Sequence, residues 1–338
     1  MFDTEAVMAL HRATLVLDSH IDIPWPGASG DDFLAATRRC VDLPKLRHGG
    51  VAAGCFAAFI PQGKRDAAAH DAALARAEAM LRAIATMAGD SARTCAGADA
   101  IEAAYRDRVP AIVPCVENGA ALGEDVGNVA RLRAFGAIYL TLTHNGHNAL
   151  ADSSVPRADL GDAATLHGGL SEFGRAAIAA MNRAGMMIDI AHVSRDGMIQ
   201  AAAASRTPVV STHSCMRALC DHPRNLDDSQ LDVLRDVGGV VQVTAVPAFL
   251  VRSGRAESVT LAHFLDHVDH AVQRIGIAHV GIGSDFDGGG GVVGWRHAGE
   301  SAAVTAGLLE RGYDAGAVGL LWGGNFLRVL RAVEAAAQ

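Results

Sequence analysis

Near the start of the chain stands the stretch Thr14-Leu15-Val16-Leu17-Asp18-Ser19-His20-Ile21-Asp22. It begins as an apolar run typical of a buried strand, and it ends with His20 and Asp22, two side chains that can bind metal ions. In an extended strand, side chains two residues apart point to the same side. His20 and Asp22 can therefore reach one ion from a single strand end, which helical spacing would not allow. The pair predicts a metal-dependent hydrolase.

Seven further apolar runs follow, and helix-like segments rich in Ala, Leu and Arg separate most of them. Most of the runs are continuously apolar, as expected of parallel strands covered on both faces. The alternation predicts one (β/α)8 (TIM) barrel domain over residues 1–338, with a doubly wound open sheet as the alternative. The eight predicted strands lie near Thr14–Ser19, Val51–Ile60, Ala111–Val116, Ala137–Thr143, Met186–Ala191, Pro208–Thr212, Val240–Ala245 and His279–Ser284.

Several intervening segments carry the start and stop patterns of helices. Ser171 is placed to cap a helix that stops at Gly185, and Asp227 with Gln230 resembles a capping box. The Ala-rich stretch Asp66–Met87 is predicted to be one long helix. These helices would cover the outside of the barrel.

Candidate ligands and acid–base groups end or follow the predicted strands. In a barrel of parallel strands the carboxyl ends meet at one mouth, so these side chains should converge there. A single histidine among fifteen would mean little, but a set at matching strand ends indicates a metal site. The set is His20, Asp22, Glu117, His144, His192, His213 and Asp285.

Neighbouring polar residues are weaker candidates. Asp287 is an alternative to Asp285, because both could face the mouth. Spacing alone favours a solvated surface for Arg224 and a packing or loop role for Cys215. Loop positions are expected for the remaining histidines near the mouth, which are His147, His167 and His222.

Composition excludes several classes of function. The net charge of −8 argues against nucleic acid or an anionic membrane surface as the main partner. We find no stretch long enough to span a bilayer, and no secretion-signal pattern follows the acidic start Met1–Glu5. Six cysteines without C-x-x-C spacing favour free thiols and a reducing cytoplasm. The only lysines, Lys45 and Lys64, fit neither a Schiff base nor a phosphate-binding loop.

Several stretches, taken together, resemble the membrane (renal) dipeptidase family, metallopeptidases of the amidohydrolase superfamily. They occur in the family's order and extend along nearly the whole chain. The stretches are Asp18–Trp25, Val116–Gly119, Leu140–Asn145, Ile188–Ser194, Ser211–Ser214, His222–Asn225, Gly283–Gly288 and Gly323–Val329.

The resemblance implies a (β/α)8 barrel that holds two zinc ions and hydrolyses dipeptides, often with a D-residue at the C-terminal position. By position, His20 and Asp22 would bind the first ion, and His192 and His213 the second. Glu117 would bridge both ions in place of the carboxylated lysine of related amidohydrolases.

Three further residues take roles by the same resemblance. Asp285 would accept a proton from a metal-bridging water and pass it to the leaving amine, and His144 would donate to the scissile carbonyl oxygen. Arg224 would bind the substrate's carboxylate through its planar fork. One departure is Val246, which stands where the family usually has a tyrosine that helps to hold substrate.

Two other functions stay open at this stage. One is a binuclear-metal hydrolase acting on a non-peptide amide or a lactone, and the other is a catalytically silent metal-binding or scaffold protein. Mixed histidine and carboxylate sites also accept Mn or Co in place of zinc. The apolar outer helices are compatible with a homodimer.

Overall fold

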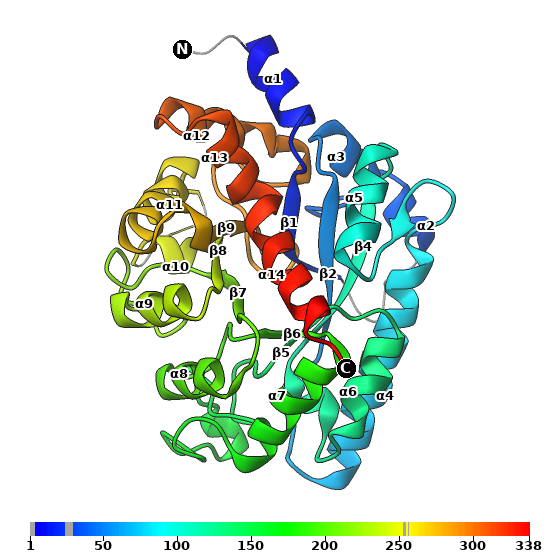
Figure 1. The fold of residues 1–338 in the computed structure, drawn as a ribbon, viewed down its shortest axis with the longest axis vertical. Coiled ribbons are helices and arrows are strands. Elements are labelled where there is room, and N and C mark those ends of the chain that lie inside the picture. Colours follow the sequence, from blue (N-terminus) through cyan, green and yellow to red (C-terminus); the bar gives the residue numbers. More distant parts are fainter. Residues whose placement is uncertain (1–3, 24–29, 253–254, 256) are drawn as a thin grey trace.

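Eight parallel strands follow one another around a barrel in the order of the sequence (Figure 1). The computed structural model describes residues 4–23, 30–252, 255 and 257–338. Pro24 and Trp25, part of the first family-like stretch, and Met1–Asp3 lie outside them. The strands are β1 (Leu17–Asp22), β2 (Ala53–Phe59), β4 (Ala111–Glu117), β5 (Tyr139–Thr141), β6 (Met187–Asp189), β7 (Val210–Ser214), β8 (Val240–Thr244) and β9 (Val280–Gly283), with the two-residue β3 (Arg93–Thr94) beside β4.

The ring of strands closes between its first and last members. The Asp22 N–H donates to the Phe286 carbonyl oxygen at 2.9 Å, and the Asp285 N–H donates to the His20 carbonyl oxygen at 3.0 Å. A doubly wound sheet would leave two edge strands unpaired, so this closure rules out that alternative. The prediction of a (β/α)8 barrel is confirmed.

Helices surround the barrel and connect the strands (Figure 1). None of the helices in the described part of the chain is both long and apolar enough to cross a bilayer. The helices are α1 (Thr4–Arg12), α2 (Gly30–Leu34), α3 (Leu43–His48), α4 (Ala67–Thr86), α5 (Ala98–Arg106), α6 (Gly127–Ala134), α7 (Glu172–Ala184), α8 (Arg195–Ala204), α9 (Asp228–Asp236), α10 (Pro247–Leu250), α11 (Leu261–Ile275), α12 (Ala302–Glu310), α13 (Ala315–Gly319) and α14 (Asn325–Ala335).

The predicted helix ends are confirmed where side chains cap them. The Ser171 hydroxyl accepts a bond from the Gly174 N–H, and Gly185 ends α7 in the left-handed conformation. Asp227 and Gln230 form a reciprocal capping box at the start of α9. Local side-chain chemistry therefore decides where these helices begin and end.

The predicted bounds of the first strand are wrong. Strand β1 starts at Leu17 and continues through Asp22, so His20 and Asp22 lie within the strand and not beyond it. Pairing with β2 and with the segment after β9 continues along these polar residues, since backbone bonds do not depend on side-chain polarity. The short strand β3 was also not predicted.

The amino end of the barrel is closed by helix α14. Phe326, Leu330 and Val333 pack in one buried cluster with strand residues such as Leu17 and Val113. Arg328 donates to backbone carbonyl oxygens directly before β8 and β9. Helix α14 thus covers the centre of the amino end, and the candidate site residues at the strand ends lie at the opposite, carboxyl end.

Candidate metal centre

Glu117, the last residue of β4, is the centre of the polar cluster and is only 2% exposed. Its Oε1 lies 3.1 Å from His192 Nε2, 3.4 Å from His213 Nε2 and 3.9 Å from His144 Nε2. Its Oε2 lies 3.7 Å from His20 Nε2. One carboxylate therefore faces four imidazoles that come from four different strand ends.

Two groups of potential ligands share Glu117. Ligand atoms of His20, Glu117 and His213 lie within 4.8 Å of one another, and so do those of Glu117, His144 and His192. His213 Nε2 also lies 3.0 Å from His192 Nε2, so His213 is close to both groups. A bridging carboxylate between two sets of imidazoles is a donor set that suits two divalent ions.

The buried atoms around His20 fit a cation. His20 Nε2 and Asp22 Oδ1 lie 3.7 Å apart, and both are buried without a hydrogen-bond partner. Buried polar atoms are almost always paired, so two orphans that face each other need a partner between them. A metal ion would supply that partner, because an imidazole nitrogen and a carboxylate oxygen are both good metal ligands.

Hydrogen bonds behind the histidines fix their tautomers. The Tyr139 hydroxyl donates to the Ser19 carbonyl oxygen at 3.0 Å and lies 2.8 Å from His20 Nδ1, so it accepts the Nδ1–H. With the proton on Nδ1, the Nε2 atom of His20, which faces Glu117, keeps its lone pair. Outer partners of this kind orient metal-binding imidazoles.

Two of the other three histidines, His213 and His192, are held in the same way. Thr212 Oγ1 donates to Asp189 Oδ2 at 2.7 Å and lies 2.9 Å from His213 Nδ1. Asn145 Oδ1 lies 3.1 Å from His192 Nδ1. Burial lowers the pKa of both histidines well below its usual value. This shift favours the neutral imidazole, which is the form that binds metal.

The electrostatics of the cluster favour a cation. Burial raises the pKa of Asp22 to about 6 and that of Asp285 well above its usual value, and the charge on Glu117 adds to both increases. Burial would lower the pKa of His20, but the negative charges of Glu117 and Asp22 raise it well above normal. Three carboxylates gathered in a largely buried cluster create a negative potential that positive charge must balance.

Asp285 reaches this cluster through a tight turn after β9. Its backbone is left-handed, with φ 59°, and its carbonyl oxygen accepts from the Gly288 N–H at 3.1 Å. A Cβ atom on Gly288 would come within 2.4 Å of Asp285 Oδ1 and 2.5 Å of Asp22 Oδ2. Glycine is therefore required where this turn passes the two carboxylates.

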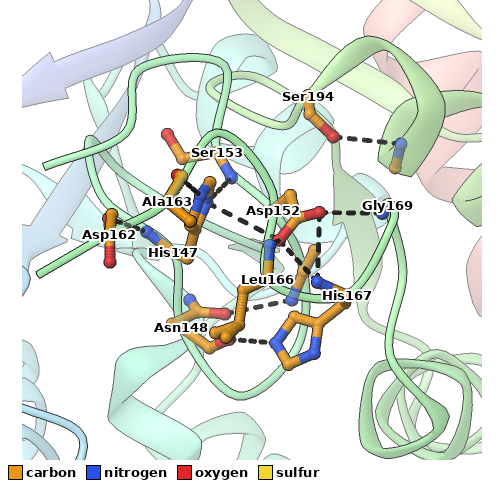
Figure 2. A network of polar contacts seen from close by, with 12 residues as sticks. His147, Asn148, Asp152, Ser153, Asp162, Ala163, Leu166, His167, Gly169 and Ser194 are labelled. Carbon is orange, nitrogen blue, oxygen red and sulfur yellow. Dashed lines mark hydrogen bonds and ion pairs between the residues drawn. The ribbon is translucent and has the colours of Figure 1, made fainter.

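The long loop between β5 and α7 forms another wall of the mouth, and a network of buried polar contacts holds it (Figure 2). The Asp152 carboxylate accepts backbone N–H bonds from Leu166, His167 and Gly169 at 2.8–3.0 Å. The Ser153 hydroxyl donates to the His144 carbonyl oxygen at 2.6 Å. The network therefore fixes the backbone that carries His144.

A cavity of about 390 Å³ opens beside the cluster and offers room for a small substrate. Arg224 lines it, is 3% exposed, and donates to the His213 carbonyl oxygen at 3.2 Å. Its guanidinium lies 5.3 Å from the ring centroid of Phe249. Val246 also lines the cavity. The solvated position that spacing favoured for Arg224 is therefore wrong.

The structure shows which of the remaining candidates line the cavity and which have other roles. Asp287 accepts from the backbone N–H groups of Cys40 and Val41 and holds that segment instead of lining the cavity. Cys215 is buried and bonds to the Thr244 carbonyl oxygen, as expected of a packing role. His147 and His167 belong to the loop network (Figure 2). His222, expected only in a loop, also lines the cavity.

Sequence reasoning missed the residues that orient the ligands. Tyr139 and Asp189 lie inside apolar strand runs and are fully buried, so each was a polar residue that needed a partner. A polar residue within an apolar run is the only signal of their role that the sequence contains. The sequence also gave no reason why position 288 should be glycine.

The barrel and its cluster are those of a metal-dependent hydrolase of the amidohydrolase type. The membrane dipeptidase family, peptidase family M19, matches residues 4–338, and the chain belongs to this family. Among curated relatives, Dipeptidase verJ of Clonostachys rogersoniana is 38% identical over 223 residues, which are 65% of this chain and 54% of that protein. The chain thus spans about half the length of that relative.

Two solved structures extend the likeness over the whole barrel. The probable dipeptidase PvdM from Pseudomonas aeruginosa is 28% identical, with a TM-score of 0.93 and 98% of each chain covered. A metallo peptidase from Rhodobacter sphaeroides, liganded with a phosphinate mimic of the dipeptide L-Ala-D-Ala, is 27% identical with a TM-score of 0.83. That comparison covers 95% of this chain and 99% of the other.

Proposed function

We propose that this chain is a zinc-dependent dipeptidase and that the cavity beside Glu117 is its active site. The observation that carries the proposal is the Glu117 carboxylate, buried among four imidazoles beside the unpartnered atoms of His20 and Asp22. Family membership and the dipeptide mimic bound to the Rhodobacter protein support a dipeptide as substrate.

The residues present would hold two metal ions. His20 and Asp22 would bind one, His192 and His213 the other, and Glu117 both, because its two oxygens face different imidazoles. Imidazole and carboxylate ligands suit zinc, and Mn or Co would substitute. When bound, the ions would polarise the substrate carbonyl and lower the pKa of a water molecule.

The protein's own groups would complete the chemistry. Asp285 would take the proton of the attacking water and deliver it to the leaving amine, a role that suits a carboxyl whose pKa burial has raised. His144 would donate a hydrogen bond to the scissile carbonyl oxygen as its negative charge grows. Arg224 would bind the substrate's terminal carboxylate with its planar fork.

Val246 would give this active site its own substrate preference. The valine side chain has no hydrogen-bond donor, so the substrate's carboxylate would depend on Arg224 and its neighbour His222 at this wall of the cavity. Val246 and Phe249 together would present an apolar surface to a substrate side chain. Dipeptides with an apolar residue at the position nearest this wall should be preferred.

A panel of substrates with metal analysis tests the proposal. Purified protein should hold about two zinc ions per chain and hydrolyse L,L and L,D dipeptides, with loss of activity on chelation and recovery on adding zinc. Activity without metal would refute it. Turnover of lactones or N-acyl amino acids alone would favour the non-peptide hydrolase, and bound metal without any turnover would favour the silent scaffold.

Three broader properties are part of the same proposal. We take residues 1–338 as a single domain that works in a reducing cytoplasm, supported by six free cysteines. The partner would be a small amide substrate and not nucleic acid or a membrane. A homodimer stays a prediction, and sedimentation velocity of the purified protein tests it.

A further inference from the structure

A second cavity, of about 480 Å³, lies at the end of the barrel opposite the candidate metal centre. Its wall includes Val51 and Ala52, directly before β2, and Val109 and Pro110, directly before β4. Parallel strands all start at the same end, whereas the metal-centre residues lie at the other. The volume is within the range of about 300–1,000 Å³ that small-molecule pockets occupy.

The wall of this cavity is strongly basic. Four arginines line it, and no aspartate or glutamate does. This is unusual in a chain whose net charge is −8. The guanidinium group binds carboxylates and phosphates bidentately, so several around one cavity form an anion-binding surface. The four are Arg12, Arg47, Arg106 and Arg108.

These arginines are largely free to bind a ligand. Within the described residues, neither the Arg12 nor the Arg108 side chain has a hydrogen bond or an ion pair. Arg47 gives one N–H to the Ser91 carbonyl oxygen at 3.0 Å. Arg106 lies 3.7 Å from Glu102, a carboxylate that is closer to another arginine.

The negative ends of three helix dipoles balance part of this positive charge, but not all of it. Arg12, Arg47 and Arg106 lie in the last turns of α1, α3 and α5, where the helix dipole favours a cation. Each helix end contributes about −0.5 of an elementary charge, so three contribute roughly −1.5. Even with Glu102 included, four guanidinium groups leave the cavity positive.

Arg108 is held in a conformation that arginine disfavours. Its φ is 57°, in the left-handed region, which costs about 1 kcal/mol or more for a residue other than glycine. The turn that ends α5 sets this conformation, because the Arg108 and Val109 N–H groups donate to the carbonyl oxygens of Tyr105 and Ala104 at 3.0 and 2.9 Å.

The floor of the cavity is apolar and its edge is aromatic. Leu46 and Val51 are buried beneath it, and the half-buried Tyr105 lies beside the arginines. From the positive wall and this apolar floor, we propose that the cavity binds a small organic anion. Its ligand is a phosphate or carboxylate attached to an aromatic or apolar body, of the size of a mononucleotide.

Titration with three probes tests this site in the metal-loaded protein. The probes are AMP, which has both the anion and the aromatic body, inorganic phosphate and adenosine. Calorimetry at low ionic strength should show saturable binding of AMP to one site, weaker binding of phosphate and little of adenosine. Added salt should weaken the binding, because the arginines are exposed. No saturable binding of AMP would overturn the proposal.

Single substitutions test whether AMP binds in this cavity. Arg12→Gln and Arg108→Gly should each weaken AMP binding about tenfold, since each removes a charged hydrogen bond. Arg108→Gly also relieves the strained backbone, so it should fold at least as well as the parent protein. Exposed Arg206, at the same end but outside the cavity, gives the control Arg206→Gln, which should bind normally.

The candidate metal centre could also attract a phosphate, and Arg224→Met separates the two sites. AMP binding that survives Arg224→Met but falls in Arg12→Gln and Arg108→Gly supports the proposal. Binding that is lost only in Arg224→Met, or that is unchanged in both cavity variants, overturns it. Dipeptide hydrolysis should be unaffected by Arg108→Gly, which keeps this test independent of the proposed activity.

Discussion

Replacing Tyr139 by phenylalanine removes one oxygen atom from behind the candidate metal centre. That hydroxyl accepts the Nδ1–H of His20 and donates to the Ser19 carbonyl oxygen, and all three residues are fully buried. The change leaves the ring of Tyr139 in place, so packing should survive. His20 would lose the contact that sets its tautomer and orientation.

The structure gives the size of two expected effects. Leaving the His20 Nδ1–H and the Ser19 oxygen unpaired costs about 1–3 kcal/mol for each group. Thr212 Oγ1, 3.5 Å from His20 Nδ1, offers partial relief. We therefore expect a loss of about 2–3 kcal/mol in the free energy of unfolding. Loss of an outer partner should also weaken binding of the metal at His20 by about 10–100-fold.

Competition with a chromogenic chelator measures the metal affinity, and urea denaturation of the metal-free protein measures the stability. The matched control is Tyr313→Phe, because the Tyr313 hydroxyl donates to Asp269 at 2.8 Å, away from the metal centre. The control should lose some stability and no metal affinity. A Tyr139→Phe protein that binds metal as tightly as the parent would refute the orienting role.

Four other predictions follow from the site and the core. Asp285→Asn should retain both metals but lose most of kcat, measured on a dipeptide; near-normal turnover would remove Asp285 from proton transfer. Arg224→Met should mainly raise KM for dipeptides, and an unchanged KM would show that the carboxylate is held elsewhere. Gly288→Ala should disturb the two carboxylates and lower activity at least tenfold, because its Cβ would come within 2.4 Å of one of them; the open position Gly63→Ala should behave as the parent. Burial lowers the pKa of His267 to about 4, below the value of about 6.5 in the unfolded chain, so the unfolded state binds more protons between these values. Stability should thus fall by about 3 kcal/mol from this residue as pH decreases from 6.5 to 4, and His267→Gln should show a shallower decrease in urea denaturation; equal slopes would contradict this.

The sequence predicted the elements that depend on local patterns. Continuous apolar runs identified all eight barrel strands, and capping residues such as Ser171 and Asp227 located helix ends. These features depend on residues within a few positions of one another. The bounds of β1 were missed because backbone pairing from two neighbouring strands, and not side-chain polarity, decides where that strand ends.

That the candidate residues gather at one mouth could also be predicted, and for a physical reason. The barrel brings strand ends together whatever their separation in sequence, so the sequence alone places His20 and Asp285 at one mouth. What a list of strand ends cannot give is the distance between side chains. The central place of Glu117, 3.1 Å from His192 and 3.7 Å from His20, emerges only from the packed barrel.

By itself, then, the sequence determined the barrel, its order of strands and the residue types that gather at the carboxyl end. Tertiary structure alone decided which hydroxyl faces His20, why Gly288 must lack a Cβ atom, and that Arg12 and Arg108 share a cavity with arginines from other helices. Hydrogen bonds and electrostatic interactions act over a few ångströms. Their partners here come from distant parts of the chain, and only folding sets those distances.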